Sequence, residues 1–167
     1  MRNKIGNLLI FLGKKILGSE AVGSNQKDEE VSLPSIEKLL IRERYRKDFE
    51  VIKLIEKPQE WIIKLVEKEE RIPPELEGKE VVLNGYKEML EIIDYPFVGK
   101  PLYLQFQRRK WKEKGSKESY SNRYEIHPEG MKATQEFGDF LKELPRQERD
   151  EFFSSFPNIR HIRQEDF

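Results

Sequence analysis

The residues best suited to bind a ligand through charge lie between Lys100 and Tyr124. This stretch carries eight basic residues against two acidic ones, a local net charge of +6. Aromatic residues are interleaved with the cations, so that a base could stack on a ring while a guanidinium or ammonium group binds phosphate. The pattern predicts a nucleic-acid-binding surface. Its members are Tyr103, Arg108, Arg109, Lys110, Trp111, Lys112, Lys114, Lys117 and Arg123.

The net charge of the whole 167-residue chain is zero, which conceals a polarised distribution. Residues 58–96 carry ten acidic residues against five basic ones, the opposite bias to residues 100–124. A polarised charge distribution steers a polyanion to one face, and lysine and arginine contacts with phosphate give a salt-dependent, sequence-independent affinity. We therefore expect a nucleic acid as the partner, DNA rather than RNA. The alternatives are an acidic protein partner, or a solvated turn whose lysines only protect a sheet edge from aggregation.

Other chemistries lack the residues that they need. The chain has no cysteine, which excludes disulfides, thiolate metal sites and thiol nucleophiles. Its two histidines, His127 and His161, are too few for a histidine-rich metal site. It also has no glycine-rich phosphate loop and no Gly-x-Ser-x-Gly elbow. We expect no catalytic residue, no metal ligand, no cofactor and no enzymatic activity; the enzymatic alternative is a metal-dependent nuclease built from carboxylates on distant elements.

Proline and glycine divide the chain into the elements that must position the basic stretch. Apolar residues at helical spacing predict helices across residues 34–94, interrupted at residues 71–85, where residues 81–83 could form a short strand. Residues 102–111 alternate with a period of two, and residues 122–127 supply a second strand after a polar turn. The sequence thus predicts a mainly helical α+β domain at residues 34–157, packed around one small antiparallel β-hairpin at residues 102–126.

Two further helices are expected after the hairpin. The first follows Pro128, and its apolar residues form the clearest helical stripe of the chain. Pro145 opens the second helix, because proline suits the first position of a helix. Residues 158–167 are expected to be a tail. The stripe of the first helix consists of Ala133, Phe137, Phe140, Leu141 and Leu144.

The N-terminal residues are predicted to form an amphipathic helix at residues 1–17 and a flexible linker at residues 18–33. Residues 3–17 of this helix could pack on the core or on a protein partner, or lie on a membrane surface with their lysines facing anionic headgroups. A secretion signal is the third interpretation. Because a chain without cysteine suits a reducing compartment, we expect a cytoplasmic protein. The apolar face consists of Ile5, Leu8, Leu9, Leu12 and Ile16.

Two stretches resemble parts of known DNA-binding families. The order of strand, basic turn, strand "RYEIHPEG" and helix "MKATQEFGDFLKEL" resembles the wing and following helix of winged-helix domains. Tyr124, Ile126, Glu129 and Gly130 match that pattern, over some 45 residues. This resemblance implies a winged-helix-like fold with a recognition helix before the first wing strand.

The stretch "DYPFVGKPLYLQFQRRKW" resembles the DNA-contacting N-terminal region of zinc-ribbon insertion-sequence transposases. In that family ribbon cysteines follow the aromatic residue, and a catalytic carboxylate domain comes later. Here Lys112, Glu113 and Gly115 occupy the corresponding positions. The resemblance implies a DNA-contacting segment without the metal site and without strand transfer. The matching positions are Asp94, Pro96, Gly99, Lys100, Pro101, Arg108, Arg109 and Trp111.

The sequence therefore favours a small non-enzymatic nucleic-acid-binding protein that uses the hairpin to contact phosphate. It would be an accessory or a relic of a mobile element. The alternative function is a structural or adaptor subunit of a larger assembly, such as a virion or a membrane-docked complex, anchored by its N-terminal helix.

Overall fold

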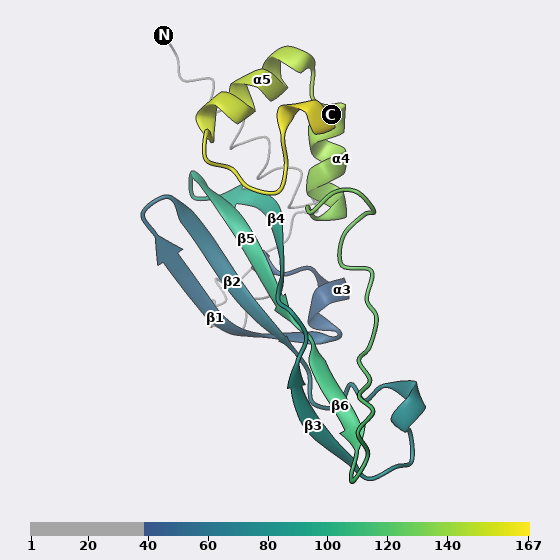
Figure 1. Cartoon of the computed structure of the whole chain (residues 1–167). Helices are drawn as coiled ribbons and strands as arrows, with labels where there is room; N and C mark the ends of the chain where they lie inside the picture. Colours follow the sequence, from purple (N-terminus) through teal and green to yellow (C-terminus); the bar gives the residue numbers. More distant parts are fainter. Residues whose placement is uncertain (1–38) are drawn as a thin grey trace, which may run out of the picture. The chain divides into compact units, whose positions relative to one another are not determined.

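Two β-sheets and a C-terminal helical segment make up residues 39–167, the part of the chain that the computed structural model describes (Figure 1). The larger sheet contains four strands in the order β1-β2-β5-β4: β1 (Phe49–Lys57), β2 (Glu60–Glu67), β5 (Lys100–Gln107) and β4 (Leu90–Phe97). The smaller sheet pairs β3 (Val81–Tyr86) with β6 (Arg109–Glu113). The helices are α3 (Glu43–Arg46), α4 (Gln135–Glu143) and α5 (Arg146–Ser155), with 3-10 turns η1 (Pro74–Leu76) and η2 (Gln164–Asp166).

The fold class predicted from the sequence is wrong. Strands account for 36% of the described residues and helices for 24%, so this part of the chain is mainly β, with two sheets. The helices expected between residues 34 and 94 are largely replaced by β1, β2 and β4, whereas β3 contains the short strand expected at residues 81–83. Strands such as "EWIIKLVE" carry adjacent apolar residues because both of their faces are buried, and such runs fit a helical pattern as well as a strand pattern.

The hairpin predicted at residues 102–126 is also absent. β5 is an inner strand, parallel to β2 and antiparallel to β4, whereas β6 pairs with β3 in the other sheet. Residues 121–127 form no strand; only Tyr120 pairs with Trp111 through an isolated bridge. The second strand of the expected wing is therefore missing from residues 121–127. The winged-helix-like fold predicted from the sequence is wrong for the same reason.

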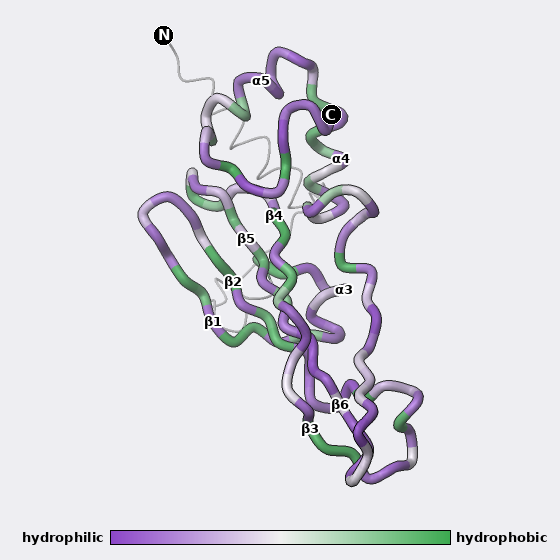
Figure 2. The backbone as a smooth tube through the Cα atoms, viewed as in Figure 1, coloured by the Kyte–Doolittle hydropathy of each residue, from purple (hydrophilic) through white to green (hydrophobic). Residues whose placement is uncertain are grey.

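One face of the larger sheet carries the main hydrophobic core. Figure 2 shows hydrophobic segments along β1, β2 and β4. α3 contributes Tyr45, whose ring lies 5.1 Å from that of Phe106 and whose hydroxyl donates a 2.8 Å hydrogen bond to the carbonyl oxygen of Ile126. Each such apolar side chain stabilises the fold by roughly 1.5–3 kcal/mol when fully buried. The buried members are Ile41, Tyr45, Phe49, Ile63, Leu65, Ile92, Leu102, Leu104, Phe106 and Ile126.

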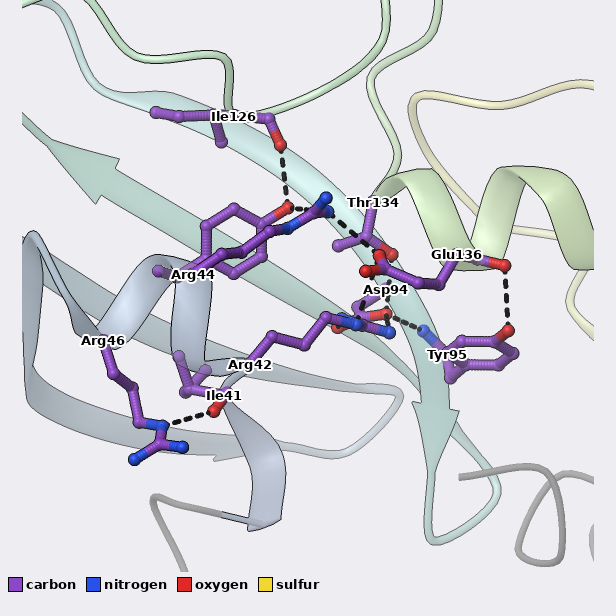
Figure 3. A network of polar contacts seen from close by, with 10 residues as sticks. Ile41, Arg42, Arg44, Arg46, Asp94, Tyr95, Ile126, Thr134 and Glu136 are labelled. Carbon is purple, nitrogen blue, oxygen red and sulfur yellow. Dashed lines mark hydrogen bonds and ion pairs between the residues drawn. The ribbon is translucent and has the colours of Figure 1, made fainter. Parts of the chain in front are cut away.

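A network of polar contacts joins the start of the described chain to β4 and α4 (Figure 3). The Asp94 carboxylate, 3% exposed, accepts two hydrogen bonds from the Arg42 guanidinium, at 2.5 and 3.1 Å. It also accepts 2.8 Å bonds from the Thr134 hydroxyl and the Tyr95 backbone amide. Burial, with the nearby carboxylates, raises the pKa of Tyr95 to about 12. The network fixes the end of β4 and the start of α4 against the segment that precedes α3.

The helices predicted after the basic stretch are confirmed at residues 135–143 and 146–155, and all five residues of the predicted stripe are buried. The predicted helix at residues 1–17 and linker at residues 18–33 lie outside the described residues. A bilayer-spanning helix needs about 20 apolar residues, and residues 39–167 contain no helix of that kind.

Candidate nucleic-acid interface

The basic side chains on β6 differ in how far they are buried. Arg109 and Trp111 are only 7% and 8% exposed, whereas Lys110 and Lys112 are half-buried. Successive side chains of a strand point to opposite faces, so the two lysines share the face that Arg109 and Trp111 do not occupy. The predicted surface residues therefore belong to two groups with different surroundings.

Arg109 is held by Glu67, a fully buried carboxylate at the end of β2. One carboxylate oxygen accepts a 2.6 Å bond from the Arg109 backbone amide, and the Glu67 carbonyl oxygen accepts a 2.7 Å bond from Arg109 Nε. The other carboxylate oxygen accepts bonds from the Asn122 amide at 2.7 Å and the Tyr124 hydroxyl at 2.5 Å. Burial first, and then this bond to Glu67, raises the pKa of Tyr124 above its usual value. Arg109 thus has a structural role, and its guanidinium is not placed to bind phosphate.

Tyr103 and Trp111, the predicted stacking residues, are both covered. Tyr103 is 1% exposed, and its hydroxyl accepts a 2.9 Å bond from the Arg160 backbone amide. The Arg160 guanidinium lies 3.9 Å above the centre of the Tyr103 ring. Trp111 exchanges two backbone hydrogen bonds with Tyr120, at 2.8 and 2.7 Å. Because both rings are buried, neither can receive a base. Alternation along a strand shows which residues share a face, but it does not show which face stays open to solvent.

The segment expected to be a tail covers Tyr103. Arg160 forms ion pairs with Glu60 and with Glu91, the latter at 3.1 Å, and His161 contacts Glu91 at 2.7 Å. Burial works to raise the pKa of Glu91, but hydrogen bonds from Gln105, His161 and Arg160 outweigh it and hold that pKa below its usual range. The end of the chain is therefore tied to the larger sheet.

A pocket of about 440 Å³ lies beside this segment, between the β1–β2 and β4–β5 turns and residues 155–160. Its charged side chains already have partners, since Lys100 pairs with Glu56 at 2.7 Å and Arg160 pairs with Glu60. An anion bound there would have to displace a carboxylate. The pocket is therefore a poor candidate for the ligand site.

Folding brings part of the acidic stretch against the basic stretch. Because β3 pairs with β6, Lys114 meets Glu80 at 2.6 Å and Glu113 meets Lys79 at 3.3 Å. Arg109 also lies 3.6 Å from Glu69. The charge polarity along the sequence is thus partly neutralised in space.

Five cations of the stretch make no ion pair with any acidic residue in the part of the chain that the structure describes. Lys110 and Lys112 lie on β6, Arg108 directly precedes it, and Lys117 and Arg123 lie in the segment that follows it. These side chains can bind an anion without breaking an ion pair. We call them the basic strand surface: Arg108, Lys110, Lys112, Lys117 and Arg123.

The sequence reasoning missed an exposed aromatic residue on the face of the smaller sheet opposite to Lys110 and Lys112. Tyr86, at the end of β3, is 45% exposed and lies opposite Arg109 in the register of the smaller sheet. Tyr86 falls within residues 34–94, where helices were expected from the apolar spacing. The dipeptide of Asn84 and Gly85 after an apolar run was the available signal, because it is typical of the end of a strand.

No protein-family model, curated protein or solved structure matches the chain. Residues 39–167 also contain no cluster of three or more side chains suited to hold a metal ion. Several positions of the transposase resemblance have structural roles in this fold: Asp94 binds Arg42, Gly99 occupies a turn with φ of 73°, and Arg109 binds Glu67. The resemblance stays a hypothesis.

Proposed function

We propose that the chain is a cytoplasmic, non-enzymatic nucleic-acid-binding protein whose contact surface is the basic strand surface. The observation that carries this proposal is the division of the cations. Arg109 and Lys114 are paired with carboxylates, whereas the five members of the basic strand surface have no such partner among residues 39–167. Their charge is available for phosphate, and an origin as a mobile-element accessory or relic agrees with this function.

The expected mode of binding is sequence-independent. Lysine and arginine contacts with phosphate release condensed counterions but carry no information about the bases. Lys110 and Lys112 share one face of β6, and both residues are half-buried with no carboxylate within ion-pair distance in the described chain. The affinity should therefore depend strongly on salt and weakly on sequence. DNA is the expected ligand rather than RNA. The alternative function as an adaptor rests on residues 3–17, outside the described residues.

The test is the double substitution Lys110→Gln with Lys112→Gln, measured by fluorescence anisotropy with a labelled oligonucleotide between about 50 and 200 mM salt. Wild-type affinity should fall linearly on a log–log plot. The double variant should bind more weakly, and its slope should be smaller by about 1–2, because two phosphate contacts are lost.

The matched control is Lys53→Gln with Lys142→Gln, which changes the net charge equally at two exposed lysines on β1 and α4. This control should keep the wild-type slope. If both double variants lose the same slope, net charge alone attracts the nucleic acid and the proposed surface is wrong. Nucleic acid has a denser line of charge than polyglutamate and should bind more tightly at equal charge concentration. If polyglutamate nevertheless displaces the oligonucleotide, the partner is an acidic protein.

A further inference from the structure

One edge of β3 has no strand partner in the part of the chain that the structure describes, because β3 pairs with β6 alone. The carbonyl oxygen of Glu80 accepts a 2.8 Å bond from the Lys114 amide, and the Lys87 amide donates a 2.9 Å bond to the Arg108 carbonyl oxygen. Backbone groups of successive residues alternate between the two edges of a strand. The residues whose backbone points away from β6 are therefore Val81, Leu83 and Tyr86.

The same residues place apolar side chains on one face of the smaller sheet. Val81 is half-buried, whereas Leu83 and Tyr86 keep 42% and 45% of their surface accessible. All three lie opposite alternate residues of β6, so they share a face. An open strand edge flanked by exposed apolar side chains is a template for pairing with another strand.

A bulge in β3 makes this strand complementary to itself. Leu83 and Tyr86 are three residues apart, whereas their partners on β6 are two residues apart, so β3 contains one extra residue. Gly85, with a φ of 84°, allows this irregularity. In a regular strand Val81 and Tyr86 would point to opposite faces. The extra residue puts them on the same face, as a cross-strand pair of two antiparallel β3 strands requires.

The charges at the two ends of β3 fit the same pairing. Lys79 and Glu80 precede the strand, and Lys87 and Glu88 follow it. When Val81 of one copy lies opposite Tyr86 of another, residues of opposite charge meet on both sides of this pair. Each contact occurs twice, because the pairing is two-fold symmetric. The charged cross-strand pairs are Glu80 with Lys87 and Lys79 with Glu88.

These side chains can reach a second copy. Lys87 and Glu88 are exposed and make no ion pair within residues 39–167. Glu80 pairs with Lys114, but 71% of its side chain is exposed, so a second lysine can approach it. The free edge is therefore matched to its own sequence in hydrogen bonding, in apolar side chains and in charge.

From this pattern we propose that the occupant of the free β3 edge is a second copy of this chain, in a two-fold dimer whose β3 strands pair antiparallel. The inference goes beyond the proposed function and does not depend on it. The two smaller sheets join into one sheet with the strand order β6-β3-β3-β6. A two-fold axis perpendicular to this sheet keeps each face on its own side. Lys110 and Lys112 of both copies therefore share the face that the apolar side chains do not occupy.

The experiment is sedimentation velocity of the 167-residue chain at rising protein concentration and low salt. The wild type should pass from monomer to dimer and stop there, because a two-fold contact closes on itself. Lys87→Glu should weaken dimerisation by roughly 10-fold or more, since it places a carboxylate opposite Glu80 at both symmetric positions. Glu80→Lys should weaken it similarly, because a lysine then lies opposite Lys87.

A mixture of these two variants tests the register. In a dimer of one Lys87→Glu chain and one Glu80→Lys chain, both cross-strand pairs again join opposite charges. The mixture should therefore dimerise with nearly wild-type affinity, although neither variant does so by itself. A defect in folding would not be repaired by mixing. Lys53→Glu is the matched control, because it makes the same charge change at an exposed lysine on β1, the outer strand of the larger sheet.

Several results would overturn the inference. A wild-type chain that stays monomeric, or that assembles beyond two copies, has no closed β3 contact. Wild-type dimerisation by Lys87→Glu, or failure of the mixture to dimerise, would show that Glu80 and Lys87 do not meet across the dimer. If Lys53→Glu weakens the dimer instead, the copies associate through β1 and the β3 contact is wrong.

Discussion

Replacing Glu67 with methionine is expected to lower the free energy of unfolding by about 3 kcal/mol, because the buried Arg109 amide and the half-buried Tyr124 hydroxyl lose their acceptor, while the Asn122 amide keeps only its bond to the Arg71 carbonyl oxygen. The Glu67 carboxylate is fully buried and accepts bonds from the Arg109 amide, the Asn122 side chain and the Tyr124 hydroxyl. Methionine has a similar volume, so the loss comes from unsatisfied polar groups and not from a cavity. Denaturant unfolding measures the change.

The matched control for this prediction is Glu69→Met. Glu69 lies two residues further along and its side chain is 80% exposed, so the same substitution should change stability by less than about 0.5 kcal/mol. Amide hydrogen exchange gives an independent readout, since the Arg109 amide should exchange faster in the Glu67→Met protein only. Equal stability of the two variants would show that Glu67 does not hold β6 against β2.

The second large effect is expected for Asp94→Asn, which should destabilise the fold by about 3 kcal/mol. The substitution removes the counter-charge of Arg42 and turns an amide NH₂ group toward a guanidinium or toward the Thr134 hydroxyl. The estimate is at the lower end for a buried pair, because the Arg42 side chain is 25% exposed and also contacts Glu136 at 3.2 Å. Thermal and denaturant unfolding both test it.

Glu136→Gln serves as the comparison for Asp94→Asn. Glu136 pairs with Arg42 and Arg44, but 41% of its side chain is exposed, so solvent screens these pairs and their loss should cost at most about 1 kcal/mol. If Glu136→Gln destabilises the protein as strongly as Asp94→Asn, the exposed ion pairs of Glu136 stabilise the fold as much as the buried Asp94 carboxylate does, which contradicts the prediction.

The sequence indicated β5 and the last two helices correctly because their periods are unambiguous. Residues 102–107 alternate cleanly, and Phe137, Phe140 and Leu141 repeat at helical spacing. β1 was missed for a specific reason: a register shift between Val51 and Lys53 breaks its alternation, so its apolar residues also fit a helical pattern. β2 was missed because the burial of both faces removes alternation altogether.

The candidate site was only partly readable because charge pairing is a property of the fold. The sequence shows that Arg109 is basic, but its partner Glu67 lies 42 residues away with no local signal to connect them. Tyr103 is covered by Arg160, 57 residues further along the chain. Lys110 and Lys112 make no ion pair within residues 39–167, so the phosphate-binding role that the sequence suggested for them is kept as a proposal.

The most direct test of the central claim is an amide NMR titration of the isotopically labelled full-length chain with a short DNA oligonucleotide at low salt. The largest shifts are expected at residues 108–112, Lys117 and Arg123, and they should shrink as salt is added. Small shifts are predicted at Arg160 and His161, which are tied to Glu91. Shifts concentrated on β1, α4 or α5, or no shifts at all, would contradict the assignment of the basic strand surface.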